Sequence, residues 1–240
     1  MSKAPKRSLS RTERPIPRVN GVYERLRKEI LSGVMPPGEF LLEEDLADRF
    51  KVSRTPLREA FIHLYRDGLL QKGPYKGYVV TEVSFTTYRE VFQLRSLLEP
   101  AAAKLAAQNP NVASLLELAE QSVERMRSFG GRKLTADEAL EAGELDSTFH
   151  CCIAQASGNG RLLRYVTELQ NVHQFSYSRY PNEPLHETVR EHQAILKAIR
   201  AGDPTKAEQS TLHHLRQALE RAKELFLGEN SLGRPWQESV

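Results

Sequence analysis

The sequence predicts a mainly α-helical protein in two parts, an N-terminal winged helix-turn-helix domain and a C-terminal all-α bundle of six helices. Apolar residues recur at spacings of three and four along most of the chain, and β-type segments with Gly and Pro turns occur only before residue 81. At 240 residues, the chain is long enough for two hydrophobic cores. We expect the two domains at 20–82 and 83–229, a disordered basic tail at 1–19 and a flexible tail at 230–240.

A helix-turn-helix is predicted between Glu43 and Leu70. Each helix carries one apolar face, formed by Leu42, Leu46, Ala47 and Phe50 in the first and by Leu57, Ala60, Phe61 and Leu64 in the second. Ser53 is expected to cap the second helix, with its hydroxyl accepting a backbone N–H. Pro56 fits the first turn, where a missing N–H costs little.

The first turn of the second helix carries basic side chains off its apolar face, Arg54 and Arg58, with Thr55 between them. In helix-turn-helix proteins this turn enters the major groove, where Arg bonds guanine or a phosphate. The alternative is that both arginines only solvate an exposed helix end. The helix dipole disfavours positive charge at this end, so two arginines there favour an external anion.

The flanking segments complete a winged helix. An amphipathic helix is predicted at 22–31, followed by a loop at 36–38 that precedes Leu41. Short strands are predicted at Leu69 and Leu70 and at Tyr78 to Val80, joined by a glycine-containing turn with Lys76 at its tip.

Charge is distributed unevenly between the two parts. Residues 1–78 hold 16 Lys and Arg against 10 Asp and Glu, whereas the remainder holds 18 against 21. The basic part is the one with the helix-turn-helix, which suits contact with phosphates. The basic segment 1–20 is either a solvated tail or an arm that embraces DNA.

Several features indicate a cytoplasmic protein without a membrane segment. No stretch reaches membrane-spanning length, and the N-terminus lacks the apolar core of a signal peptide. Cys151 and Cys152 are adjacent and cannot form an ordinary disulfide framework, so we interpret them as small core residues of a helix.

Six helices are predicted in the second part, at 85–108, 111–128, 136–156, 160–178, 184–201 and 204–227. Glycine, asparagine and proline mark the breaks between them. No strand pattern competes, so an all-α bundle follows.

Polar residues are expected on inward faces of three bundle helices: Asp146 and His150, four residues apart, in one, His192 in another, and His213 and His214 in the last. Imidazole and carboxylate groups suit a divalent metal such as zinc, nickel or manganese. The alternative is that each histidine is a hydrogen-bonded core residue. Spacing alone leaves both interpretations open.

The first part resembles the DNA-binding domain of GntR-type bacterial transcription regulators. The matching residues are Pro37-Gly38, Leu42-Glu43, Asp45-Leu46-Ala47, the run VSRTPLREA at 52–60, Asp67-Gly68-Leu69-Leu70 and Gly77. The resemblance implies that Arg54 and Arg58 contact operator DNA, assisted by Ser53, Thr55, Lys76 and Gly77. Many members carry an arginine where this chain has Glu44, and a glutamate cannot make that phosphate or guanine contact.

The second part resembles the ligand-binding domain called FCD, found in the FadR subgroup of these regulators. The matching motifs are DSTFH at 146–150, ASGN at 156–159, EHQAI at 191–195, Gly202-Asp203 and His214-Leu215. Six helices resemble the VanR-like branch. The resemblance implies a metal held by Asp146, His150, His192 and His214, with His214 preferred over His213 by its spacing from Gly202-Asp203.

The same resemblance implies a small organic acid bound near the metal, with Arg95 as its cationic partner, and a homodimer on double-stranded operator DNA. For Arg95 the alternative is an ion pair with Glu99 on a solvated helix face. Asn171, His173 and Tyr177 are further candidates for the cavity lining. A group of leucines either forms the dimer interface or belongs to the bundle core: Leu97, Leu98, Leu115, Leu116 and Leu118.

The predicted function is therefore a sequence-specific transcription regulator, a repressor as in most family members, that is controlled by an effector. Two other classes stay open. In a metal-dependent hydrolytic enzyme, an Asp- and His-held metal would activate water. In a structural DNA-binding protein without an effector, the polar cluster would only stabilise the bundle.

Overall fold

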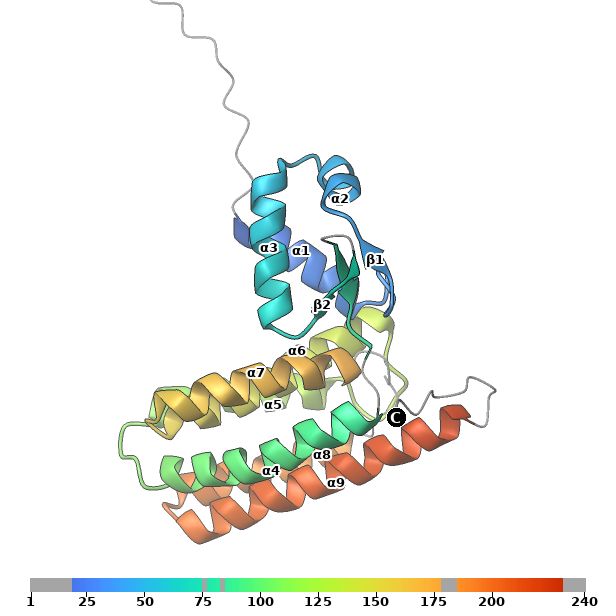
Figure 1. Cartoon of the computed structure of the whole chain (residues 1–240). Helices are drawn as coiled ribbons and strands as arrows, with labels where there is room; N and C mark the ends of the chain where they lie inside the picture. Colours follow the sequence, from blue (N-terminus) through green and yellow to red (C-terminus); the bar gives the residue numbers. More distant parts are fainter. Residues whose placement is uncertain (1–18, 75–76, 83–84, 178–184, 231–240) are drawn as a thin grey trace, which may run out of the picture.

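A computed structural model describes residues 19–74, 77–82, 85–177 and 185–230. The basic tail, the wing tip at Lys76 and the C-terminal tail from residue 231 lie outside these ranges. The described N-terminal part contains α1 (Val19–Leu31), β1 (Phe40–Leu41), α2 (Glu43–Phe50), α3 (Arg54–Arg66), β2 (Leu70–Lys72) and β3 (Tyr78–Val80). This is the predicted winged helix-turn-helix, with α3 as its recognition helix (Figure 1).

The turn between α2 and α3 differs from the prediction in one detail. Lys51 ends α2 in the left-handed region, with φ at 55°, and its N–H donates to the carbonyl of Ala47. Ser53 is the N-cap of α3, as predicted, but its hydroxyl accepts no capping hydrogen bond. An N-cap hydroxyl normally binds the N–H of the second or third helical residue. The third residue here is Pro56, which has no N–H, so one of these two donors is absent.

The wing is a three-stranded antiparallel sheet in the order β1-β3-β2. The sequence prediction missed β1, because two residues are too few to show an alternating pattern. β1 pairs Phe40 with Val79. A side chain at Gly77 would overlap the ring of Phe40. Gly77 therefore has a packing role in the wing, and its contact with DNA stays a prediction.

The second part is the predicted bundle of six helices. They are α4 (Phe85–Ala106), α5 (Ala113–Ser128), α6 (Ala136–Ala156), α7 (Gly160–Tyr177), α8 (Leu185–Arg200) and α9 (Pro204–Asn230). A capping box between Thr135 and Glu138 fixes the start of α6. Cys152 lies in the main bundle core, and Cys151 is half-buried with its thiol 3.6 Å from the hydroxyl of Thr167. Among the described helices, none is long and apolar enough to cross a membrane.

The winged domain lies next to α6 and α7 (Figure 1). Helices α4 and α9 lie on the opposite side of α6 and α7 from the winged domain. The side chain of Leu140, from α6, is 6% exposed and belongs to the apolar core of the winged domain. Arg27 of α1 donates a short hydrogen bond to Gln174 of α7, and its guanidinium lies 3.5 Å from Glu144 of α6. Among the described residues, these apolar and polar contacts join the DNA-binding domain to the bundle.

Replacing Leu140 with alanine should destabilise the protein by about 2–5 kcal/mol, the usual cost of a buried Leu→Ala cavity. Leu118→Ala is the matched control, because Leu118 is 50% exposed on α5 and such substitutions change stability by less than about 0.5 kcal/mol. Urea unfolding followed by circular dichroism measures both variants. Equal midpoints for the two variants would contradict a stable packing of α6 into the winged domain.

Candidate metal centre and nucleic-acid interface

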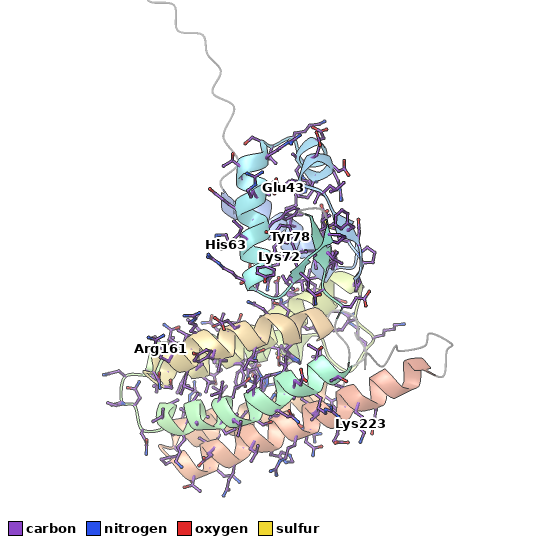
Figure 2. The ribbon with its side chains drawn as sticks, in the orientation of Figure 1. Glu43, His63, Lys72, Tyr78, Arg161 and Lys223 are labelled. Atoms are coloured by element: carbon purple, nitrogen blue, oxygen red, sulfur yellow. The ribbon has the colours of Figure 1, made fainter. Side chains whose placement is uncertain are left out.

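The recognition helix presents its arginines at the tip of the winged domain. The side chains of Arg54 and Arg58 are more than half exposed, as predicted. Each has a partner on α2, however. Glu43 lies in the upper part of the winged domain in Figure 2. Nε and Nη2 of Arg58 donate hydrogen bonds to its carboxylate, with shortest distances of 3.1 and 2.8 Å, and Arg54 donates one to Glu44 at 2.5 Å. The first turn of α2 therefore supplies two carboxylates to this helix end, so its positive charge does not by itself indicate an external anion.

Inside the bundle, the four predicted metal ligands come together. Asp146 and His150 come from α6, His192 from α8 and His214 from α9, and all four are buried. One ligand atom from each lies within 4.8 Å of the others. We call these four residues the metal-binding cluster. His213 is exposed, so only His214 of the last helix faces the cluster.

The ring nitrogens of the cluster converge. Nε2 of His214 lies 3.3 Å from Nε2 of His150 and 3.3 Å from Nε2 of His192. Oδ1 of Asp146 lies 3.5 Å from Nε2 of His192. The ring of Phe149 stacks on His192 with centroids 3.8 Å apart. The packing thus directs three imidazole edges and one carboxylate at a common point.

Two carboxylates outside the cluster contact the opposite edges of two rings. Nδ1 of His150 lies 2.6 Å from Oε2 of Glu99, and Nδ1 of His214 is hydrogen-bonded to Oε2 of Glu191 at 2.7 Å. Burial alone would raise the pKa of Glu191, but hydrogen bonds from His214 and Arg221 outweigh it and lower this pKa to about 2. Glu191 is therefore ionised at neutral pH.

Glu99 is ionised for the same reason. Burial by itself would raise its pKa, but the charge of Arg95 and the contact with His150 hold the pKa far below the usual range. Oε1 of Glu99 accepts hydrogen bonds from Nε of Arg95 at 2.7 Å and from Nε2 of Gln170 at 3.1 Å. Arg95 and Gln170 therefore hold Oε1 of Glu99, while Oε2 of the same carboxylate contacts His150.

An ionised carboxylate only accepts hydrogen bonds, so we infer that the Nδ1 atoms of His150 and His214 carry the hydrogens. In the neutral rings, both Nε2 atoms then present lone pairs to each other across 3.3 Å. A divalent cation between them would satisfy both lone pairs, and a carboxylate behind each ring is the usual outer support of a histidine ligand. The residues present therefore fit a metal ion.

Arg95 forms the ion pair with Glu99 that was the alternative to an effector contact. The pair is buried, however, and does not lie on a solvated helix face. Arg95 is 1% exposed, and two of its guanidinium nitrogens, Nη1 and Nη2, have no hydrogen-bond partner among the described residues. Oε1 of Gln170 also has none. Unpaired buried polar atoms are costly, so these atoms favour a polar ligand beside them. A small organic acid at Arg95 stays a prediction.

Of the further candidates for the cavity, the structure brings His173 to the cluster. Its Nε2 lies 3.3 Å from Oδ2 of Asp146. Burial lowers the pKa of His173 to about 4, and the charge of Arg95 acts in the same direction. Asn171 is half-buried, and the side chain of Tyr177 lies outside the described residues.

Sequence reasoning did not assign roles to Gln170, Glu191 or Arg221, and it misjudged the setting of Glu99. A signal existed for Glu99, four residues after Arg95, and for Glu191, directly before His192. Neither signal shows which ring the carboxylate contacts. Arg221 donates to both oxygens of Glu191, at 2.9 and 3.0 Å, across 30 residues of chain, which no local pattern reveals.

Comparison with protein-family models gives two matches along this chain. The model described as bacterial regulatory proteins, gntR family, matches residues 18–80, and the FCD domain model matches residues 90–217. The chain belongs to the GntR family. The two matched segments are the winged helix and the bundle that carries the metal-binding cluster.

Similar proteins agree with this assignment. The uncharacterised HTH-type transcriptional regulator YdhC of Bacillus subtilis is 30% identical over 223 residues, which cover 88% of this GntR-family chain and 97% of YdhC. The HTH-type transcriptional repressor RspR of Escherichia coli is 29% identical, covering 85% of this chain and 88% of RspR. The structure of Escherichia coli McbR/YncC superposes with a TM-score of 0.67 at 21% identity, covering 87% and 98% of the two chains, and shows a shared fold.

Membership of the GntR family decides between the function classes left open by the sequence. The chain is a transcription regulator with a DNA-binding domain and an FCD domain. Its relatives are regulators and not enzymes, so the metal-dependent hydrolase is not the function of this chain.

Proposed function

We propose that this GntR-family regulator is a repressor that binds operator DNA as a homodimer, carries a divalent metal in its FCD domain and is released by a small carboxylate. The observation that carries the proposal is the convergence of three imidazole Nε2 atoms with Asp146, at 3.3 to 3.5 Å, beneath a winged helix. Repression is extended from RspR, whose name describes it as a repressor.

DNA binding is assigned to the first turn of α3 and to the wing. Arg54 and Arg58 would enter the major groove with Thr55, while Ser53 and the wing around Lys76 and Gly77 contact the backbone. Because Glu43 and Glu44 hold the two arginines in the free protein, each arginine exchanges a carboxylate for a guanine edge or a phosphate. Charge-assisted hydrogen bonds are kept on both sides of this exchange.

A homodimer would place two recognition helices on the half-sites of a near-palindromic operator. The leucines considered for the interface fall into two groups. Leu116 is buried in the bundle core, and Leu115 and Leu98 pack against buried apolar residues. Leu97 on α4 is 70% exposed and Leu118 on α5 is 50% exposed. Leu94, one turn earlier on α4, is 50% exposed. This apolar stripe supports α4 as the dimer face, and sedimentation equilibrium would give twice 27.2 kDa for a dimer.

The metal would be held by the four residues of the metal-binding cluster and would act as a Lewis acid toward one oxygen of a carboxylate effector. Zinc, nickel and manganese remain the candidate ions. Arg95 would bind the same effector through Nη1 and Nη2, which have no partner among the described residues. To release DNA, the effector must bind more tightly to the arrangement of the two winged domains that does not fit the operator.

Arg58→Ala should weaken operator binding by about 1–3 kcal/mol, because it removes an arginine from the groove-facing turn. An operator selected from random duplex DNA and fluorescence anisotropy would measure this. Arg66→Ala is the matched control, since Arg66 is exposed in the last turn of α3. Equal affinity of wild type and Arg58→Ala would remove Arg58 from the interface.

His214→Ala should abolish stoichiometric metal binding, whereas His213→Ala should retain it, because only His214 faces the cluster. Plasma mass spectrometry after dialysis against metal-free buffer measures the metal content. Metal should raise the unfolding temperature of wild type and of His213→Ala, since binding to the folded state stabilises it. Metal-free wild type after loading with zinc, nickel or manganese would refute the metal site.

A panel of small carboxylic acids should contain one that lowers the operator affinity of metal-loaded protein. The response should be lost in Arg95→Lys, which keeps the positive charge beside Glu99 but lacks the two-pronged donor of arginine. Anisotropy of labelled operator, with metal content checked in both proteins, gives the result. A full response in Arg95→Lys would place the effector elsewhere.

A further inference from the structure

His173 lies beside the metal-binding cluster but is not one of its four members. It comes from α7, a helix that supplies none of the four proposed ligands, and its side chain is buried. Both of its ring nitrogens face polar groups. Nε2 lies 3.3 Å from Oδ2 of Asp146, and Nδ1 lies 3.2 Å from the hydroxyl of Tyr88. The ring also packs edge-on against Phe92, with centroids 5.4 Å apart.

The two oxygens of Asp146 have different surroundings. Oδ1 lies 3.5 Å from Nε2 of His192 and so faces the point where the imidazole edges meet. Oδ2 lies 3.3 Å from His173 and 3.8 Å from Nε2 of His150. A carboxylate can bind a metal through one oxygen or through both, and the second mode needs both oxygens turned to the ion. His173 contacts Oδ2, which is the oxygen that the second mode would add.

The contact with Asp146 indicates which nitrogen of His173 carries the hydrogen. The carboxylate of Asp146 can only accept, so Nε2 is the donor toward it. Nδ1 is then the acceptor, and the hydroxyl of Tyr88 donates to it. Tyr88 lies in the first turn of α4, so the chain of contacts from Tyr88 through His173 to Asp146 spans α4, α7 and α6.

We propose that His173 is a positioning residue of the metal centre, which holds Oδ2 of Asp146 so that this carboxylate offers only Oδ1 to the ion. The inference rests on the proposed metal site and adds a residue to it. His173 acts through Asp146 and is not a ligand itself, because the ligand atoms that lie within 4.8 Å of one another belong to the four cluster residues and not to His173. It therefore sets the coordination number of the site and, through it, the choice of ion.

Cobalt(II) tests this directly, because its visible absorption changes with the number of ligands. The full-length protein is stripped of metal and titrated with cobalt(II) against a competing chelator. His173→Leu should bind cobalt about 10- to 100-fold more weakly than wild type, as expected for the loss of an outer-shell partner, and with a changed spectrum. His173→Gln, whose amide can still donate to Asp146, should restore the spectrum in large part. His213→Leu is the matched control on the exposed neighbour of His214.

The possible outcomes distinguish a failure of the metal site from a failure of the role assigned to His173. If wild type binds cobalt and His173→Leu binds it with the same affinity and spectrum, His173 has no positioning role and only this inference falls. If wild type binds no cobalt, the metal site and this inference both fall. If His173→Leu does not fold, as judged by circular dichroism, Tyr88→Phe decides, because it removes only the hydroxyl that fixes the ring. An unchanged cobalt spectrum and affinity in Tyr88→Phe would then overturn the inference.

Discussion

The interior of the bundle is organised by the Nε2 atoms of His150 and His214, which face each other at 3.3 Å. This arrangement exists because ionised carboxylates, Glu99 and Glu191, hold the Nδ1 hydrogens of His150 and His214 on the outer side. Those carboxylates stay ionised in a buried site because each is paired with an arginine. Removing one partner from such a buried network leaves a charge without compensation, which is far more costly than losing a surface pair.

The same centre joins most of the bundle and reaches the DNA-binding domain. The four residues of the cluster come from α6, α8 and α9, and α4 supplies Glu99 behind one of the rings. Helix α6 also contributes Leu140 to the winged-domain core, and α7 contacts Asp146 through His173 and α1 through its next residue, Gln174. A displacement of α6 or α7 at the cluster would therefore be transmitted to the winged domain through side chains that contact it directly. These are Leu140, in the winged-domain core, and Gln174, which accepts a hydrogen bond from Arg27.

The sequence allowed most helices and the four cluster residues to be predicted, because amphipathic periodicity and family motifs are local signals. It failed where the decisive contact is not local. The two residues of β1 become a strand only by pairing with β3, which is far away in the sequence. The spacing of Arg95 and Glu99 predicted their ion pair but not its burial. That burial depends on α7, which supplies Gln170 from 71 residues further along the chain.

The pairing of recognition-helix arginines with α2 has a consequence for the speed of DNA association. Glu43 and Glu44 bring the formal charge of these four paired side chains to zero, and long-range attraction to DNA depends on the summed charge rather than on single contacts. The four side chains together therefore add little to electrostatic steering, although the arginines could contribute strongly once the helix is in the groove. The rate at which DNA is captured would then depend on basic residues elsewhere in the chain.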